Sequence, residues 1–198
     1  MLSPEELKRR YMEQWERSNA RERFVALALN AYLPRPWRAE LTGLGAGVDD
    51  YIPRSYSRPE DAFDITVYYG DRPVAWVEVT GVPSSSDMRR HPACRGLCVG
   101  LWKLRKAREF RVVERLWFAF VVDESWSVRW LPAKQLDYWE QGEAPWLQRC
   151  RLRRDERTAL CTEPHRWRRY RTFQYWLTRY ALLLTNITQS QATASQRG

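Results

Sequence analysis

The segment at residues 75–81, AWVEVTG, places a single carboxylate inside a run that otherwise predicts a buried strand. Tryptophan, valine and threonine favour extended backbone, and Gly81 ends the run. An ionised carboxylate inside a sheet loses its water, so Glu78 needs a compensating cation, a hydrogen-bond network or a metal ion. Which of these three groups compensates Glu78 decides what the chain can do.

A second predicted strand precedes this one and brings a further carboxylate. Residues 63–69 favour a strand, a turn follows, and Asp64 lies early in that strand. Because side chains alternate along a strand, Asp64 shares a face with Glu78 and Thr80 only if paired residue numbers sum to an even value. A sum of 142 sets Asp64 opposite Glu78 and requires an odd-length loop or a bulge. We therefore expect two carboxylates to converge at an edge of the sheet.

Two converging carboxylates have a specific chemical use. Together with water and a phosphate oxygen they form the ligand set that Mg²⁺ or Mn²⁺ takes in proteins. Such an ion polarises phosphorus and helps to generate hydroxide, the general route to phosphodiester cleavage. In the alternative interpretation Asp64 is a strand-end cap, and Glu78 is a core acid paired with an arginine, a residue that is abundant in this sequence.

The remaining elements complete an α/β layout. Ser3 and Pro4 favour a helix start, and an apolar stripe at helical spacing extends that helix to about Tyr32. Prolines 34 and 36, the glycine-rich segment TGLGAG (42–47) and the polar segment 49–60 predict a long loop. Further along we expect a basic helix over 90–111 interrupted near its glycines, strands over 116–123 and 127–131, and a short helix from 132.

These features, taken in order, resemble the PD-(D/E)XK nuclease superfamily of restriction-endonuclease-like proteins. Within it they most resemble archaeal Holliday junction resolvases. The resemblance rests on Glu22 in a first helix, the TGLGAG loop, Asp64 in DITV and Glu78 in VEVT, and it covers about residues 20–135. It implies a mixed central sheet flanked by helices. It also implies Mg²⁺-dependent cleavage of DNA in recombination, repair or restriction, by a homodimer. By position, Asp64 and Glu78 would bind the metal and Glu22 would support it.

The sequence departs from the pattern of that superfamily at two positions. Phe63 replaces a proline before the motif aspartate, and Thr80 stands where the family places a lysine. That lysine orients the attacking water and offsets developing charge, whereas a threonine hydroxyl positions water without bringing charge. Some similar restriction enzymes also carry Glu-Val-Thr here. We expect Lys103 or Lys106, on the following helix, to substitute; the alternative is an inactive nuclease that still binds DNA.

Positive charge is concentrated at the end of the chain. Residues 146–198 hold 11 arginines against three acids, whereas the first 145 residues are nearly balanced. We therefore separate a nuclease-like domain over 1–140 from a basic, aromatic extension over 141–198, which comprises a hairpin (147–162), a helix (168–186) and a frayed tail (187–198). The arginines interleave with aromatic residues in 165–176, a pattern that favours nucleic acid over a merely solubilising tail.

Specific residues follow as expected DNA contacts. They are basic side chains on the helix after the acids and in the extension: Arg89, Arg90, Arg105, Lys106, Arg166, Arg168, Arg169 and Arg171. A rival function needs no catalysis, because arginine and stacked Trp or Tyr rings suffice for a single-stranded DNA-binding protein. A third hypothesis is an interaction protein whose acids are only ion-paired.

The four cysteines allow a disulfide. A two-residue turn at 155–156 would set Cys150 opposite Cys161 in the hairpin, close enough for a bond. Cytosolic disulfides are typical of hyperthermophiles, and the excess of arginine over lysine also fits a thermophilic source, although base composition produces the same bias. Cys94 and Cys98 fit one turn of helix; their spacing with His91 is not a standard zinc pattern, which favours thiols or a second disulfide.

Targeting signals bear on the compartment of the chain. The first 24 residues contain no apolar segment of the kind found in a secretory signal. No apolar run approaches the roughly 20 residues of a membrane span. We therefore expect a soluble, cytoplasmic chain with no membrane partner.

Overall fold

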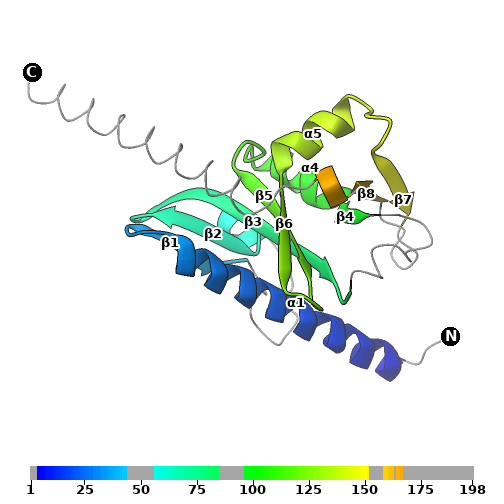
Figure 1. The fold of residues 1–198 in the computed structure, drawn as a ribbon, viewed down its shortest axis with the longest axis horizontal. Helices are drawn as coiled ribbons and strands as arrows, with labels where there is room; N and C mark the ends of the chain where they lie inside the picture. The colour runs from blue at the N-terminus through cyan, green and yellow to red at the C-terminus, as the bar shows by residue number, and fades with distance from the viewer. Residues whose placement is uncertain (1–3, 44–55, 85–95, 152–157, 163, 167–198) are drawn as a thin grey trace, which may run out of the picture.

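The structure is a computed structural model of the 198-residue chain, and it describes residues 4–43, 56–84, 96–151, 158–162 and 164–166. The chain alternates helices and strands from the first helix to a short 3₁₀ turn (Figure 1). In chain order the elements are α1 (Pro4–Tyr32), β1 (Trp37–Leu41), α2 (Pro59–Ala62), β2 (Ile65–Tyr69), β3 (Arg72–Val82), β4 (Leu97–Gly100), α4 (Leu101–Glu109), β5 (Leu116–Val122), β6 (Ser127–Pro132), α5 (Ala133–Gln141), β7 (Gln148–Arg151), β8 (Thr158–Thr162) and η1 (Pro164–Arg166).

A five-stranded mixed sheet forms the centre of the fold. Its strand order is β1-β2-β3-β5-β6, with β3 and β5 parallel and every other neighbouring pair antiparallel. Every residue of β5, LWFAFVV, is buried, which explains why this continuous apolar run becomes a central strand. The parallel pair requires a crossover, and β4 with α4 provides it. The expected α/β fold with a mixed central sheet is confirmed.

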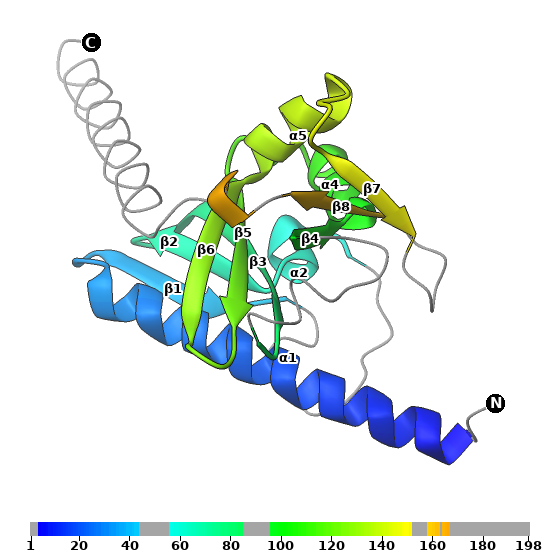
Figure 2. The ribbon, with the colours of Figure 1, turned by 45° about the vertical axis from the view of Figure 1, so that its right-hand side comes forward.

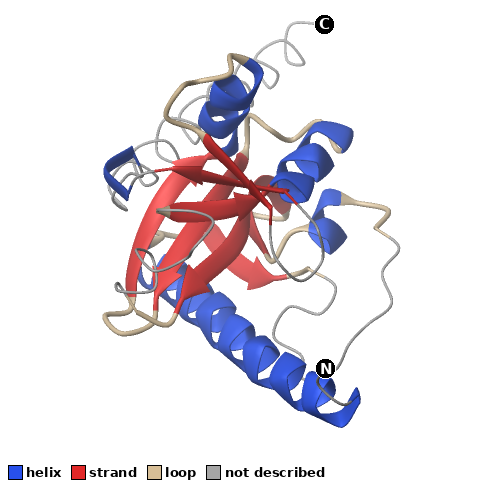
Figure 3. Cartoon of the chain, turned by 90° about the vertical axis from the view of Figure 1, so that its right-hand side faces the viewer, coloured by secondary structure: helices blue, strands red, loops and turns tan. Residues whose placement is uncertain are grey.

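Helices cover both faces of this sheet (Figures 2 and 3). On one face Val25 and Leu29 of α1 pack against Val77 and Val79 of β3. On the other face the core is built from the end of α2, from α4 and α5, and from alternate residues of the strands, including Trp76. Because side chains alternate along β3, Glu78 and Thr80 share the face of Trp76 and point toward α4.

A second, three-stranded sheet lies on the α4 side. Its strand order is β4-β8-β7, and both neighbouring pairs are antiparallel. The β7–β8 hairpin therefore completes a sheet whose first strand, β4, precedes α4. Leu160 of β8 is fully buried in the same apolar cluster as Leu97 and Val99 of β4. The predicted hairpin over 147–162 is therefore present as β7 and β8, and it packs onto the main core.

Three elements differ from the sequence-based prediction. β1 lies where a loop was expected; the Asn30 side chain of α1 holds it, because Nδ2 donates to Ala39 O and Oδ1 accepts from Ala39 N–H, both at 2.8 Å. α2 forms within the end of the predicted polar loop. β4 occupies the first part of the helix predicted over 90–111, so only 101–109 is helical. The helix predicted over 168–186 and the tail over 187–198 lie outside the described residues.

The first helix agrees closely with its prediction, since α1 ends at Tyr32. Trp37 and the residues that follow continue directly into the sheet. Among the helices of the described residues, none combines the length and the apolarity that crossing a lipid bilayer requires.

Candidate active site

The pairing of β2 with β3 brings two acids together. Ile65 pairs with Val77 and Thr66 with Trp76, so the paired numbers sum to 142 as expected, and a bulge follows between Val67 and Tyr68. Asp64 directly precedes Ile65, and Glu78 directly follows Val77. Asp64 Oδ2 accepts a hydrogen bond of 2.7 Å from the backbone N–H of Val79. The predicted register and bulge are confirmed, and they place the Asp64 carboxyl beside the backbone that carries Glu78.

Lys103 compensates Glu78. The Glu78 carboxylate is only 4% exposed, and Lys103 Nζ lies 2.5 Å from its Oε1. The same ammonium donates to the backbone carbonyl of Val79 at 3.5 Å. Lys103 reaches this position because α4 begins at Leu101, directly after β4, and faces the sheet with its first turn. The site thus contains a lysine that Thr80 does not provide from its own strand.

Glu22 of α1 adds a third carboxylate. It is 6% exposed and accepts a hydrogen bond of 3.2 Å from Ser18 Oγ, one helical turn earlier. Its neighbour Arg21 fixes the helix, because the guanidinium makes a two-pronged pair with Asp123 at the end of β5, with both distances 2.7 Å. The negative charge of Glu22 raises the pKa of Asp64, so this third acid lies within electrostatic range of the other two.

The electrostatics show an excess of negative charge. Burial raises the pKa of the Asp64 carboxyl well above its usual value, and the Glu78 and Glu22 carboxylates raise it further. The positive charge of Lys103 and the N–H of Val79 act in the opposite direction but do not offset this rise. Burial lowers the pKa of the Lys103 ammonium, yet the negative charge of Glu78 and the other acids outweighs it, so this pKa lies above the usual value. The charge of Lys103 thus interacts with all three acids.

Two of these acids are donors of the type that a divalent cation takes. No group of three or more His, Cys, Asp and Glu side chains within the described part of the chain has the arrangement of a ready-made metal site. Asp64 and Glu78 supply two carboxylates in a cluster that holds more negative than positive charge. Mg²⁺ is bound in this way, by one or two carboxylates together with waters and substrate phosphate, rather than by a cage of protein ligands.

The start of the glycine-rich segment holds Asp64 by its backbone. The N–H groups of Thr42 and Gly43 both point at the carbonyl of Asp64, at 3.1 and 3.4 Å. A Cβ on Gly43 would lie 2.6 Å from Phe63 O, a distance that real structures do not tolerate. Glycine at 43 therefore permits the close approach that positions the Asp64 backbone, while residues 44–47 of this segment lie outside the described residues.

The two lysines of α4 have different partners. Lys106 is 9% exposed, donates to Ala62 O at 2.8 Å and lies 4.0 Å from the ring centroid of Tyr56. The expectation that Lys106 contacts DNA is wrong, because its ammonium is buried under the segment that leads to Asp64. Sequence reasoning missed this role, although the spacing of three residues between Lys103 and Lys106 indicates one face of a helix.

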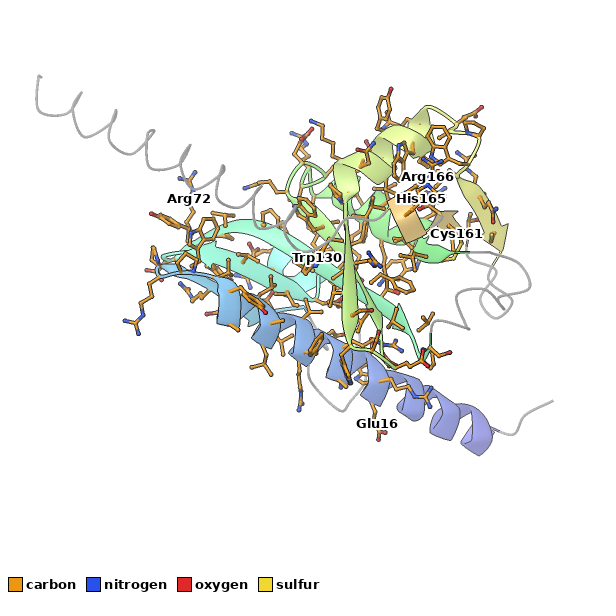
Figure 4. The ribbon with its side chains drawn as sticks, viewed as in Figure 1. Glu16, Arg72, Trp130, Cys161, His165 and Arg166 are labelled. Carbon is orange, nitrogen blue, oxygen red and sulfur yellow. A yellow bond between two sulfur atoms is a disulfide. The ribbon has the colours of Figure 1, made fainter. Side chains whose placement is uncertain are left out.

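The other expected DNA contacts fall in different places. Arg105 is exposed on α4. Arg166 lies in η1, and its guanidinium carbon is 4.3 Å from the ring centroid of Trp146. Figure 4 shows Arg166 next to His165, with Cys161 below both. The remaining residues are outside the described part of the chain: Arg89, Arg90, Arg168, Arg169 and Arg171.

The cysteine pairing differs from the prediction. Cys98 of β4 is bonded to Cys161 of β8, across a pair of directly opposed residues. In the β7–β8 hairpin Cys150 instead lies opposite Ala159, so the Cys150–Cys161 bond was wrong by two residues of register. Cys150 is itself a disulfide cysteine. The one-turn helical spacing expected of Cys94 and Cys98 is also wrong, since Cys98 is in a strand.

Comparison with known proteins gives a fold relationship. No family model and no curated protein sequence matches the chain. The chain is similar to a solved structure described as "Structure of D212, a nuclease from a fusselovirus". The TM-score is 0.54 at 14% sequence identity, and the alignment covers 82% of this chain and 88% of that chain. The α/β fold described above is thus shared with a viral nuclease over most of both chains.

Proposed function

We propose that this chain is a metal-dependent deoxyribonuclease of the PD-(D/E)XK type, an endonuclease that hydrolyses a DNA phosphodiester with Mg²⁺ or Mn²⁺. The observation that carries the proposal is the convergence of Asp64 and Glu78 on adjacent strands, beside the Lys103 ammonium. The shared fold with a protein described as a nuclease supports it.

Each residue has a role that its position supports. Asp64 and Glu78 would hold the ion, which when bound polarises the phosphorus and lowers the pKa of a water ligand. Glu22 adds negative charge that increases the attraction of the cluster for a cation. Lys103 provides the positive charge that offsets the charge developing on phosphate, the task that Thr80 cannot perform. The Thr80 hydroxyl, on the same face of β3, helps to place the attacking water.

DNA is the substrate that the charge distribution supports best. The arginines after residue 145 supply an excess of positive charge, which a polyanion neutralises. Arg105 is exposed on the outer side of α4, two residues after Lys103 and so on a different face of the helix, where it could contact a phosphate away from the acid cluster. The rival hypothesis, a DNA-binding protein without catalysis, shares these features and differs only at the acid cluster.

A cleavage assay separates the two hypotheses. The purified chain is incubated with labelled single-stranded, duplex and four-way-junction DNA in Mg²⁺, in Mn²⁺ or in EDTA. The matched variants are Glu78→Gln, which removes a proposed metal ligand, and Glu114→Gln, whose carboxylate is 67% exposed in a surface pair with Lys134. Metal-dependent cleavage that is lost only in Glu78→Gln establishes the nuclease. Salt-sensitive binding without cleavage in either metal overturns it in favour of a DNA-binding protein.

A further inference from the structure

The Lys103 ammonium lies where a cation would bind. Its Nζ contacts two oxygens of consecutive residues, Glu78 Oε1 at 2.5 Å and the backbone carbonyl of Val79 at 3.5 Å. The N–H of that same Val79 donates to Asp64. The positive charge of the lysine therefore lies against Glu78, one of the two ligands of our proposed metal site, and beside the residue that bonds the other, Asp64. Its contacts are with oxygens, the atoms that hard divalent cations select.

A lysine and a divalent ion cannot share this position. Both are cations, and both require the Glu78 carboxylate at contact distance. Like charges so close together in a buried site repel each other strongly, because little water is present to screen them. Lys103 reaches the carboxylate by a flexible four-carbon stem, so its charged end can leave without any movement of the helix.

The ring of Trp102 also lies beside the ammonium. Lys103 Nζ is 5.4 Å from the ring centroid of Trp102, the preceding residue of α4, and an aromatic face attracts a cation at this range. Lys106, one turn later, provides a contrast. Its ammonium bonds to a backbone carbonyl and lies among three rings, with no carboxylate among these partners. Lys103, by contrast, pairs directly with a proposed metal ligand.

We infer that Lys103 is a resident counter-ion of the acid cluster, which a divalent metal ion displaces, so that metal binding itself releases the ammonium for the phosphate of the substrate. This inference rests on the proposed metal site. It assigns Lys103 two successive tasks. Without metal it neutralises Glu78 and stabilises the buried acids, and with metal it becomes available as the positive group beside the reacting phosphate.

Mn²⁺ binding measured by electron paramagnetic resonance tests the displacement without any measurement of activity. The chains compared are the native protein, Lys103→Met, Glu78→Gln and the surface control Lys134→Met, in mildly alkaline buffer. Removal of the competing cation should tighten Mn²⁺ binding in Lys103→Met by about tenfold or more, the scale at which one close charge interaction alters binding. Lys134→Met should bind as the native chain does, because its lysine pairs with exposed Glu114.

The outcomes are distinguishable. Equal or weaker binding by Lys103→Met, with Glu78→Gln unable to bind, overturns the displacement and leaves the metal site standing. Equal Mn²⁺ binding by the native chain and Glu78→Gln, or none by the native chain, overturns the metal site itself and the inference with it.

A second measurement uses the native chain, so it does not depend on the stability of a variant. The chain has only four lysines, at 8, 103, 106 and 134, so lysine labelled with ¹⁵N at Nζ gives few signals in an NMR spectrum. Saturating Mg²⁺ should shift or broaden the Lys103 ammonium signal and leave those of Lys106 and Lys134 unchanged. The Mg²⁺ concentration is chosen so that it raises the melting temperature of the native chain but not that of Glu78→Gln. An unchanged Lys103 signal at that concentration contradicts the inference.

Discussion

Asp64 and Glu78 each stand one residue beyond the Ile65–Val77 pair on neighbouring antiparallel strands, and the Val79 N–H donates to Asp64 Oδ2 across 2.7 Å. This relationship fixes the Asp64 carboxyl by the backbone that follows Glu78. Any change that slides β2 along β3 by one residue would turn Asp64 to the α1 face and separate the two acids. The geometry of the site is therefore as rigid as the register of the sheet.

Substitution Asp64→Asn should abolish cleavage and leave the fold intact. The amide oxygen of asparagine can still accept from Val79 N–H, but it brings no negative charge for a cation. We expect Mn²⁺ affinity and cleavage rate each to fall by more than about a hundredfold, since even residues outside the ligand shell alter metal sites about 10–100-fold. Calorimetric titration with Mn²⁺ and the cleavage assay check this. Retention of native Mn²⁺ affinity by Asp64→Asn would remove Asp64 from the metal site.

The raised pKa of Asp64 predicts how stability depends on pH in EDTA. The folded chain binds the Asp64 proton more tightly than the unfolded chain does, so this group stabilises the fold fully below its unfolded pKa of about 3.9. That contribution is lost as the pH rises through the higher folded pKa. The raised pKa of Lys103 acts only above the usual lysine range and does not enter this window.

Urea unfolding of the native chain and Asp64→Asn across this pH window measures the effect. As the pH rises, the free energy of unfolding of the native chain should fall relative to that of Asp64→Asn, because asparagine has no proton to lose. Parallel curves for the two chains across the window would show that the folded pKa of Asp64 is not raised.

Gly43→Ala should disturb Asp64 through its backbone. The new Cβ would lie 2.6 Å from Phe63 O and 3.0 Å from Asp64 Cα, so the segment before β2 must move. We expect a loss of about 1–3 kcal/mol in the free energy of unfolding, typical of overpacked sites, together with weaker Mn²⁺ binding. Gly70→Ala is a control with a stability loss of a different origin: no atom lies within 4 Å of its Cβ position, but its φ of +59° strains alanine by about 1–2 kcal/mol, so its Mn²⁺ affinity should stay native. Native Mn²⁺ affinity in Gly43→Ala would show that the close approach does not position Asp64.

Arg21→Met should loosen the attachment of α1. The Arg21–Asp123 pair has two hydrogen bonds of 2.7 Å, and its side chains are only 11% and 22% exposed. Charged hydrogen bonds of this kind contribute about 1.5–3 kcal/mol. Arg58→Met, whose side chain is 70% exposed where it pairs with Asp61, should lower the free energy of unfolding much less than Arg21→Met does. Chemical denaturation compares the two variants, and equal losses would count against a special role for the Arg21 pair.

The Cys98–Cys161 bond should stabilise the small sheet. It joins residues that are 63 apart in sequence, for which the chain-entropy model gives about 4 kcal/mol. The double substitution Cys98→Ser with Cys161→Ser should therefore lower the melting temperature substantially without reductant, while Cys150 keeps its own disulfide in both chains. Calorimetry of the two chains in non-reducing buffer tests this. A melting temperature that is unaffected by the double substitution would refute the stabilisation.

The sequence was most informative where patterns were long or locally constrained. The continuous apolar run of β5 predicts a central strand, and the alternation around Glu78 restricts the register to even sums. The bulge between Val67 and Tyr68 satisfied that restriction although no single residue predicts it. α1 was predicted because its start signal and its apolar stripe both persist over several turns.

The errors involve short elements set by long-range contacts. β4 is only four residues long, follows Gly96 and ends at Gly100, so no periodicity distinguishes LCVG from an interrupted helix. Its partner strand lies some 60 positions later in the sequence. The same lack of local information led to the wrong partner for Cys161. The choice between Lys103 and Lys106 also depended on β4, because the start of α4 decides which lysine faces Glu78.

The strand β8 can join β4 only after some 60 further residues have been synthesised. The two acids of the site are close in sequence, whereas Lys103 follows a strand whose partner lies 63 residues away. A ribosome adds about 5–20 residues per second, so β4 emerges roughly 3–13 seconds before the strand that pairs with it. The acids thus form a local hairpin early, and their lysine is anchored last. A nascent chain that has not yet made β8 would carry the two acids of the proposed site without the sheet that anchors Lys103.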